Sequence, residues 1–173
     1  MFEIKPCDPH TYRQQTRRST LIVALVFVAL AMLLSSLAVM LFGEPGGDNF
    51  RFNVGGVLAA VLLTVALVRG PLWSQPWLAP AIYGWQLKRS LMRVTNVMHT
   101  VTEQVQANNP AALKLLRFYH LGLTQMHELD ANSSAQAQLV HEIEEHKAKM
   151  QALGMEIEQT RLDPAWLDVL KKP

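Results

Sequence analysis

The chain has 173 residues, of which 17% are charged and 50% are hydrophobic, and its net charge is +2 at pH 7. A soluble domain carries about 25% charged residues, and here the charge is missing from one region, because Glu44, Asp48 and Arg51 are the only ionisable residues between Arg18 and Arg69. These numbers predict a membrane protein with a water-exposed tail. The small net charge gives no indication of nucleic-acid binding. The chain has a single cysteine, which excludes a disulfide within it.

Two apolar runs predict a helical hairpin across the membrane over residues 20–68. A cytoplasmic N-terminal segment, residues 1–19, comes first. The first run, residues 20–42, reaches about 34 Å as a helix, which is enough to cross a hydrocarbon core of about 30 Å. The second run covers residues 52–68, and the stretch between the runs, residues 43–51, contains three glycines and a proline, which indicates a tight periplasmic turn.

The lysines and arginines predict the orientation of this hairpin. Four lie before the first span and four follow the second up to Arg93, whereas the turn has only Arg51. Both termini are therefore expected in the cytoplasm. A cleaved signal peptide is the alternative, but the first apolar run exceeds the roughly 7–15 residues of a signal-peptide core. The spans contain no ionisable residue, which argues against a transporter or pump built from this chain alone.

Small residues recur at every fourth position on the second span, at Gly56, Ala60 and Thr64. Such a face lets two helix backbones approach each other closely. We expect this face to pack against the first span within the hairpin. A contact between two copies of the chain is the alternative.

A collar rich in proline and aromatic residues follows over residues 69–80. Its prolines forbid a continuous helix, and indole and phenol rings prefer the boundary between membrane and water. We expect the collar to lie along the cytoplasmic interface, and a re-entrant pass through residues 71–87 stays open as an alternative. The predicted interface anchors are Arg17, Arg18, Arg69, Trp73, Trp77, Tyr83 and Trp85.

Residues 81–173 have the apolar spacing of packed helices. Apolar residues follow one another at intervals of three and four, the pattern of an a/d seam, and no strand pattern is found. The predicted helices are 81–107, 110–130, 134–160 and 164–171. We therefore predict an all-α membrane protein whose hairpin is followed by an antiparallel helical bundle or a coiled-coil-like tail. The seam residues singled out are Leu87, Leu91, Met98, Leu139, Ile143, His146, Met150, Leu153 and Ile157.

The stretch HEIEEH, residues 141–146, superficially resembles a zinc-protease motif. That motif needs histidines four residues apart on one helix face, whereas these are five apart and point about 140° from each other. We expect His141 on the outer face and His146 on the seam, where a polar residue fixes register or oligomeric state. A metal site formed by His120, His127 and His146 is the weaker alternative, and no cofactor is predicted.

Three stretches resemble a known family: DPHTYRQQTRRST, GEPGGDNFRFNVGGVLA and HKAKMQALG. The chain is similar to a family of small, uncharacterised two-pass inner-membrane proteins of gammaproteobacteria such as pseudomonads. The resemblance covers most of the chain and implies two membrane passes in the bacterial cytoplasmic membrane. It implies no activity and no functional residues.

No nucleotide-binding loop, nucleophile elbow or Cys-x-x-Cys pair is found, so no enzymatic activity is predicted. The expected function is that of a non-enzymatic membrane-anchored scaffold. Its cytoplasmic helical module is expected to bind copies of itself or another membrane or cytoplasmic protein. The alternatives are an accessory subunit of a larger membrane complex and a metal-binding helical bundle.

Overall fold

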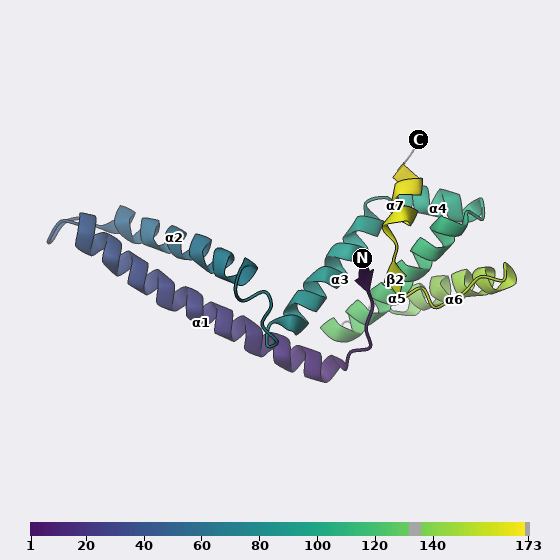
Figure 1. Cartoon of the computed structure of the whole chain (residues 1–173), viewed down its shortest axis with the longest axis horizontal. Coiled ribbons are helices and arrows are strands. Elements are labelled where there is room, and N and C mark those ends of the chain that lie inside the picture. The colour runs from purple at the N-terminus through teal and green to yellow at the C-terminus, as the bar shows by residue number, and fades with distance from the viewer. Residues whose placement is uncertain (132–135, 172–173) are drawn as a thin grey trace. The chain divides into compact units, whose positions relative to one another are not determined.

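The computed structural model describes residues 1–131 and 136–171, which form seven helices and one pair of short strands (Figure 1). The predicted all-α class is confirmed for this part of the chain. Two compact units are present: the α1–α2 unit, Gln14–Ile82, and the α5 unit, which joins Met1–Arg13 to Tyr83–Pro173. The elements are β1 (Phe2–Glu3), α1 (Pro9–Phe42), α2 (Phe50–Arg69), α3 (Ala79–Thr95), α4 (Met98–Gln106), α5 (Pro110–Asp130), α6 (Gln136–Ala152), β2 (Arg161–Leu162) and α7 (Pro164–Lys171).

Three helices, α1, α5 and α7, begin at an aspartate or asparagine followed by proline. Proline suits the first helical position because an N–H there would have no partner within the helix. The predicted helices 110–130 and 164–171 begin at such a proline, whereas the first helix begins at Pro9 and not at residue 20. The side chains of Asp8, Asn109 and Asp163 accept the backbone N–H groups of Thr11, Ala111 and Ala165 at 2.7, 2.9 and 2.9 Å.

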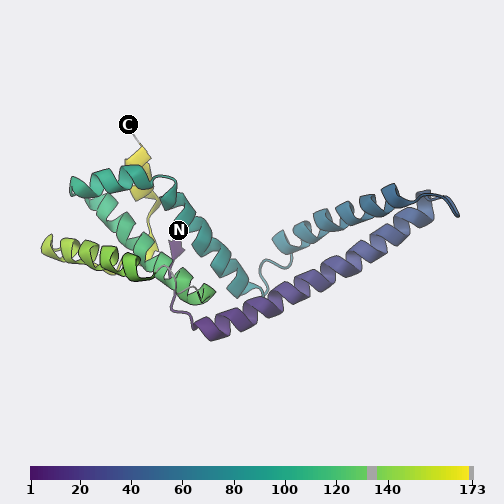
Figure 2. The same cartoon turned by 180° about the vertical axis from the view of Figure 1, so that it is seen from behind.

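In the α1–α2 unit the two helices run side by side in opposite directions, as the views from both sides show (Figure 2). A Cβ atom on Gly56 would overlap the backbone of Ser35, and the Ser35 hydroxyl donates to the carbonyl of Asn53 at 3.0 Å. Gly56, Ala60 and Thr64 are the buried residues of α2, so this small-residue face packs against α1. Both helices are long and apolar enough to cross a membrane, by length and composition.

The turn between α1 and α2 is closed by the side chain of Asn49. Its amide oxygen accepts the N–H of Glu44 at 3.0 Å, and its amide nitrogen donates to the carbonyl of the same residue at 3.1 Å. Gly46 supplies the left-handed backbone conformation of this turn, with φ 74°. The second helix begins at Phe50, two residues earlier than the apolar run indicated, because Asp48 accepts the N–H of Phe50.

The core of the α5 unit lies along α5. Ala112, Leu113, Leu115 and Phe118 have no exposed surface, and α4, α6, α7 and β2 all pack against this helix. The residues of the largest buried cluster come from α3, α4, α5, β2 and α7: Val94, Val101, Ala112, Leu115, Phe118, Leu162, Leu167 and Leu170.

The N-terminal residues belong to the α5 unit. β1 pairs antiparallel with β2, so that Phe2 lies opposite Leu162, and the N–H of Ile4 donates to the carbonyl of Thr160 at 2.8 Å. The prediction of a separate segment 1–19 missed this pairing. Two residues per strand are too few to produce the alternation by which a strand is recognised in a sequence.

The predicted helix 81–107 is two helices, α3 and α4, with a turn at Asn96–Val97. The turn falls in the sequence VTNV, whose valine, threonine and asparagine residues are weak helix formers. Val94 and Val101 are nevertheless both fully buried. The turn therefore changes the direction of the chain without removing the seam residues from the core.

The predicted helix 134–160 begins at Gln136 and ends at Ala152, and residues 134–135 lie outside the described residues. Gly154 has a positive φ of 66°, and the N–H of Met155 returns to the carbonyl of Met150 at 2.9 Å, which is a glycine-dependent helix end. Two predicted seam residues therefore leave the helix: Leu153 is 47% exposed, and Ile157 lies in the extended segment that leads to β2.

Replacing Gly154 with alanine should lower the free energy of unfolding of the α5 unit by about 1 kcal/mol, because alanine carries a steric cost at positive φ. Gly154→Asn should cost less, since asparagine tolerates this conformation better. Denaturant unfolding of the full chain in mild detergent measures both. Equal stability of the alanine variant and the wild type would contradict the proposed helix end.

Candidate functional site

A groove of about 580 Å³ lies between α4, α5 and α6. Its volume falls within the range of roughly 300–1,000 Å³ that is usual for binding sites. Apolar side chains from all three helices line one part of it: Met98, Val105, Leu116, Leu123 and Leu139. The polar part is lined by His120, Glu142, Glu145, His146 and Lys149.

Two buried histidines meet beside this groove. His120 on α5 is 5% exposed and His146 on α6 is 6% exposed, and their ring centroids lie 5.3 Å apart with the ring planes at 84°. The Nε2 atom of His146 lies 3.0 Å from the carbonyl oxygen of Leu113. Since a carbonyl only accepts, this nitrogen carries the proton and Nδ1 has the lone pair. The Nδ1 atom of His120 is buried without a hydrogen-bond partner among the described residues.

Both imidazoles are neutral at neutral pH. Burial, with smaller contributions from His146 and Arg117, lowers the pKa of His120 from 6.5 to about 4. Burial also lowers the pKa of His146, and the hydrogen bond to Leu113 partly offsets this shift. A general base works best with a pKa near the pH of the reaction. A histidine with a pKa of about 4 is therefore poorly suited to accept a proton at neutral pH, and the pair has the features of a structural contact.

Arg117 connects the buried pair to the extended segment after α6. It is buried, and its Nε donates to the carbonyl of Ile157 at 2.8 Å. No carboxylate in residues 1–131 and 136–171 lies within ion-pair distance of it. A second cavity, of about 420 Å³, is lined by Arg117 and His120 together with Cys7, Gln125 and Glu128.

The predicted metal ligands do not come together. His120 and His146 are neighbours, but His127 lies seven residues, or roughly 10 Å, further along α5. Within the part of the chain that the structure describes, no group of three or more His, Cys, Asp or Glu residues is arranged to hold a metal ion.

The remaining predicted site residues fall into two groups, the seam residues and the interface anchors. The seam residues Leu87, Leu91 and Met150 are buried, and Met98, Leu139 and Ile143 are half-buried. Of the predicted interface anchors, Arg17, Arg18, Arg69 and Trp85 are exposed and Trp73 and Trp77 are half-buried.

Tyr83 has a role that the sequence prediction missed. Its hydroxyl donates to Gln125 and accepts the N–H of Lys5 at 3.0 Å, and the Gln125 amide donates to the carbonyl of Lys5 at 2.6 Å. These bonds hold the segment between β1 and α1 against α3 and α5. The phenol predicted to anchor the chain at the membrane is engaged within the α5 unit.

A family model described as a protein of unknown function, DUF3087, matches residues 2–167. The chain belongs to the DUF3087 family. The match includes both segments of the α5 unit and all of the α1–α2 unit, so the DUF3087 family covers nearly the whole chain. No curated protein and no solved structure matches this DUF3087 chain.

The buried histidine pair should make stability depend on pH. The folded-state pKa of His120, about 4, lies below its unfolded value of about 6.5. The unfolded chain therefore binds more protons between these pH values. The contribution of His120 to the free energy of unfolding is fully present above about pH 6.5. It decreases by roughly 3 kcal/mol as the pH falls to about 4.

Denaturant unfolding between pH 4 and pH 7.5 measures this dependence. His120→Gln should flatten the slope below pH 6.5, because glutamine does not titrate. His99→Gln is the control, since the His99 side chain is 88% exposed and should leave the slope unchanged. Equal slopes for wild type and His120→Gln would show that His120 titrates normally in the folded chain.

Proposed function

We propose that the chain is a non-enzymatic integral inner-membrane protein. Its α1–α2 hairpin crosses the bacterial cytoplasmic membrane twice, and the α5 unit is a cytoplasmic helical module that binds an amphipathic helix of a protein partner. In this role the chain is a scaffold or adaptor. The observation that carries the proposal is the open groove between α4, α5 and α6, lined by seam side chains from all three helices.

The exposed apolar surface of α1 and α2 supports the membrane location. Large side chains such as Leu25, Met32, Met40 and Leu62 are more than two-thirds exposed. Exposing this much contiguous apolar surface to water is unfavourable, at roughly 25 cal/mol per Å². A bilayer removes the cost because its hydrocarbon is as apolar as the side chains.

The discontinuity of the α5 unit supports the two-pass topology. One compact unit contains both the segment before the spans and the segment after them. Both segments must then lie on the same side of the membrane, which requires an even number of crossings. The excess of lysine and arginine on these segments supports the cytoplasmic side.

The groove favours an amphipathic helix with basic residues at its edge. Such a helix places apolar side chains at every third or fourth position into an apolar groove, and the side chains of Leu116, Leu123 and Leu139 line it. Glu142 and Glu145 lie at the exposed edge of the groove, where they complement positive charge on the partner. A second copy of the chain is one source of such a helix, because α3 exposes Met92 and carries Lys88, Arg89 and Arg93.

A reporter enzyme that is active only in the cytoplasm should work when fused after the last residue, and one that is active only in the periplasm should not. The physical reason is the charge asymmetry across the two spans. The opposite pattern would overturn the proposed orientation and favour a cleaved signal peptide.

Reversing the charge at the edge of the groove should weaken partner binding. We expect Glu142→Lys with Glu145→Lys to reduce crosslinked complexes from native membranes at least about five-fold, through like-charge repulsion. Glu144→Lys with Glu156→Lys changes the net charge equally at exposed positions outside the groove lining and should leave the complexes intact.

Chemical crosslinking followed by mass measurement in mild detergent reads out both double variants, and the masses distinguish a second copy from a different protein. A wild-type chain that is strictly monomeric with no crosslinked protein would refute the proposal. An equal loss for both double variants would show that the groove is not the binding surface.

A further inference from the structure

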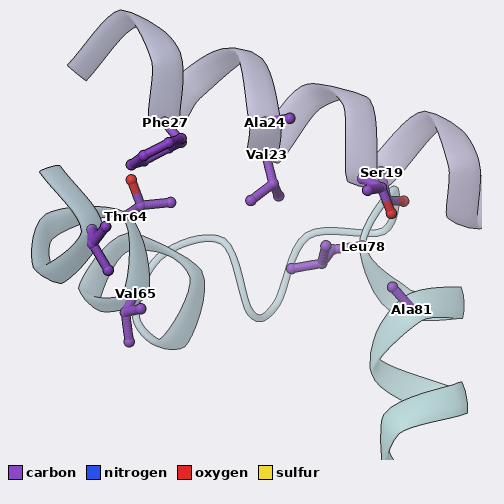
Figure 3. Close-up of a pocket in the computed structure, with 10 residues that line it drawn as sticks. Ser19, Val23, Ala24, Phe27, Thr64, Val65, Leu78 and Ala81 are labelled. Atoms are coloured by element: carbon purple, nitrogen blue, oxygen red, sulfur yellow. The ribbon is translucent and has the colours of Figure 1, made fainter. Parts of the chain in front are cut away.

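A third cavity, of about 530 Å³, lies wholly within the α1–α2 unit. It is bordered by α1, α2 and the segment that leads from α2 into α3 (Figure 3). Val23 and Phe27 project from α1 toward the side on which Thr64 and Leu78 lie. We call it the apolar cleft, because carbon atoms make up nearly all of its lining.

The polar atoms of the apolar cleft are already engaged. The Ser19 hydroxyl lies within hydrogen-bonding distance of the carbonyls of Gln15 and Trp77. The hydroxyl of Thr20 donates to its own helix, to the carbonyl of Thr16 at 2.9 Å, and that of Thr64 does the same, to Ala60 at 2.7 Å. A hydroxyl has one hydrogen to donate. The cleft therefore offers no free donor to a polar ligand and suits a hydrocarbon.

The cleft opens where α2 changes from small to larger residues. Near the turn, Gly56 lets the backbones of α1 and α2 approach closely. Two turns further along α2, the lining residues are Thr64 and Val65, and Phe27 lies on the α1 side. On the buried face of α2 the residues increase in size from Gly56 through Ala60 to Thr64, and the cleft lies at the Thr64 end.

The volume of about 530 Å³ is available to a single hydrocarbon chain, which is flexible and can fill the space along its length.

Positive charge lies close to the cleft in the sequence. Arg17 and Arg18 immediately precede Ser19 on α1. Arg69 follows Val65 by about one turn of α2. All three arginines are exposed. In the proposed orientation this end of the hairpin lies at the cytoplasmic surface, at the level of lipid phosphates. An arginine guanidinium binds a phosphate through charge-assisted hydrogen bonds.

We propose that the apolar cleft binds one acyl chain of an anionic phospholipid, with the lipid phosphate beside Arg18 and Arg69. This inference rests on the membrane location given under the proposed function. The bound lipid would fill the space between α1, α2 and Leu78 and so complete the packing of the α1–α2 unit.

Native mass spectrometry of the full chain tests the proposal. The chain is purified in mild detergent from vesicles that contain equal amounts of phosphatidylglycerol and phosphatidylethanolamine. We expect one phosphatidylglycerol retained per chain. Ala24→Trp, which fills the cleft, should reduce retention at least about five-fold, and Ala29→Trp, at an exposed position on α1 outside the lining, should not.

A charge variant tests the headgroup. Arg18→Gln with Arg69→Gln should abolish the preference for phosphatidylglycerol, whereas Arg51→Gln, at the other end of the helices, should preserve it. No retained lipid, equal retention of both lipids by the wild type, or equal effects of the two tryptophan variants would overturn the lipid site. Membrane fractionation separates the two proposals: a chain that inserts in the membrane but retains no lipid refutes only this inference, and a chain found in the soluble fraction refutes both.

Discussion

The burial of α5 is the constraint from which the rest of its unit follows. Phe118 and its neighbours have no exposed surface, and four other elements pack against this helix. The middle turns of α5 are enclosed in this way, and Arg117 and His120 are buried there with the apolar residues. Arg117 then bonds to a backbone carbonyl, and His120 stays uncharged at neutral pH. The groove beside them is what α4 and α6 leave uncovered.

The helices could be predicted wherever apolar periodicity was long or a cap was present in the sequence. α5 has the predicted bounds 110–130, because Asn109 and Pro110 define its start and the spacing continues for six turns. The break at Asn96–Val97 and the end at Ala152 were missed, because the three-four spacing continues across both. The three-four spacing indicates which residues are buried, but it does not indicate whether the backbone between them stays helical. Gly154 was the signal in the sequence for the end of α6 at Ala152.

The candidate site could be predicted only in part. The five-residue spacing of His141 and His146 predicted one exposed and one buried ring, and the structure has this arrangement. The contact between His146 and His120 depends on how α5 and α6 are aligned, which spacing along one helix does not reveal. The apolar cleft also had a signal, the increase in residue size from Gly56 through Ala60 to Thr64 on α2.

The pairing of β1 with β2 has a consequence for biosynthesis. Glu3 pairs with Arg161, 158 positions later in the chain. At a translation rate of about 5–20 residues per second, the first strand waits roughly 10–30 s on the ribosome before its partner is made. Both apolar helices leave the ribosome in that interval. The α5 unit therefore closes only after both apolar helices have been synthesised.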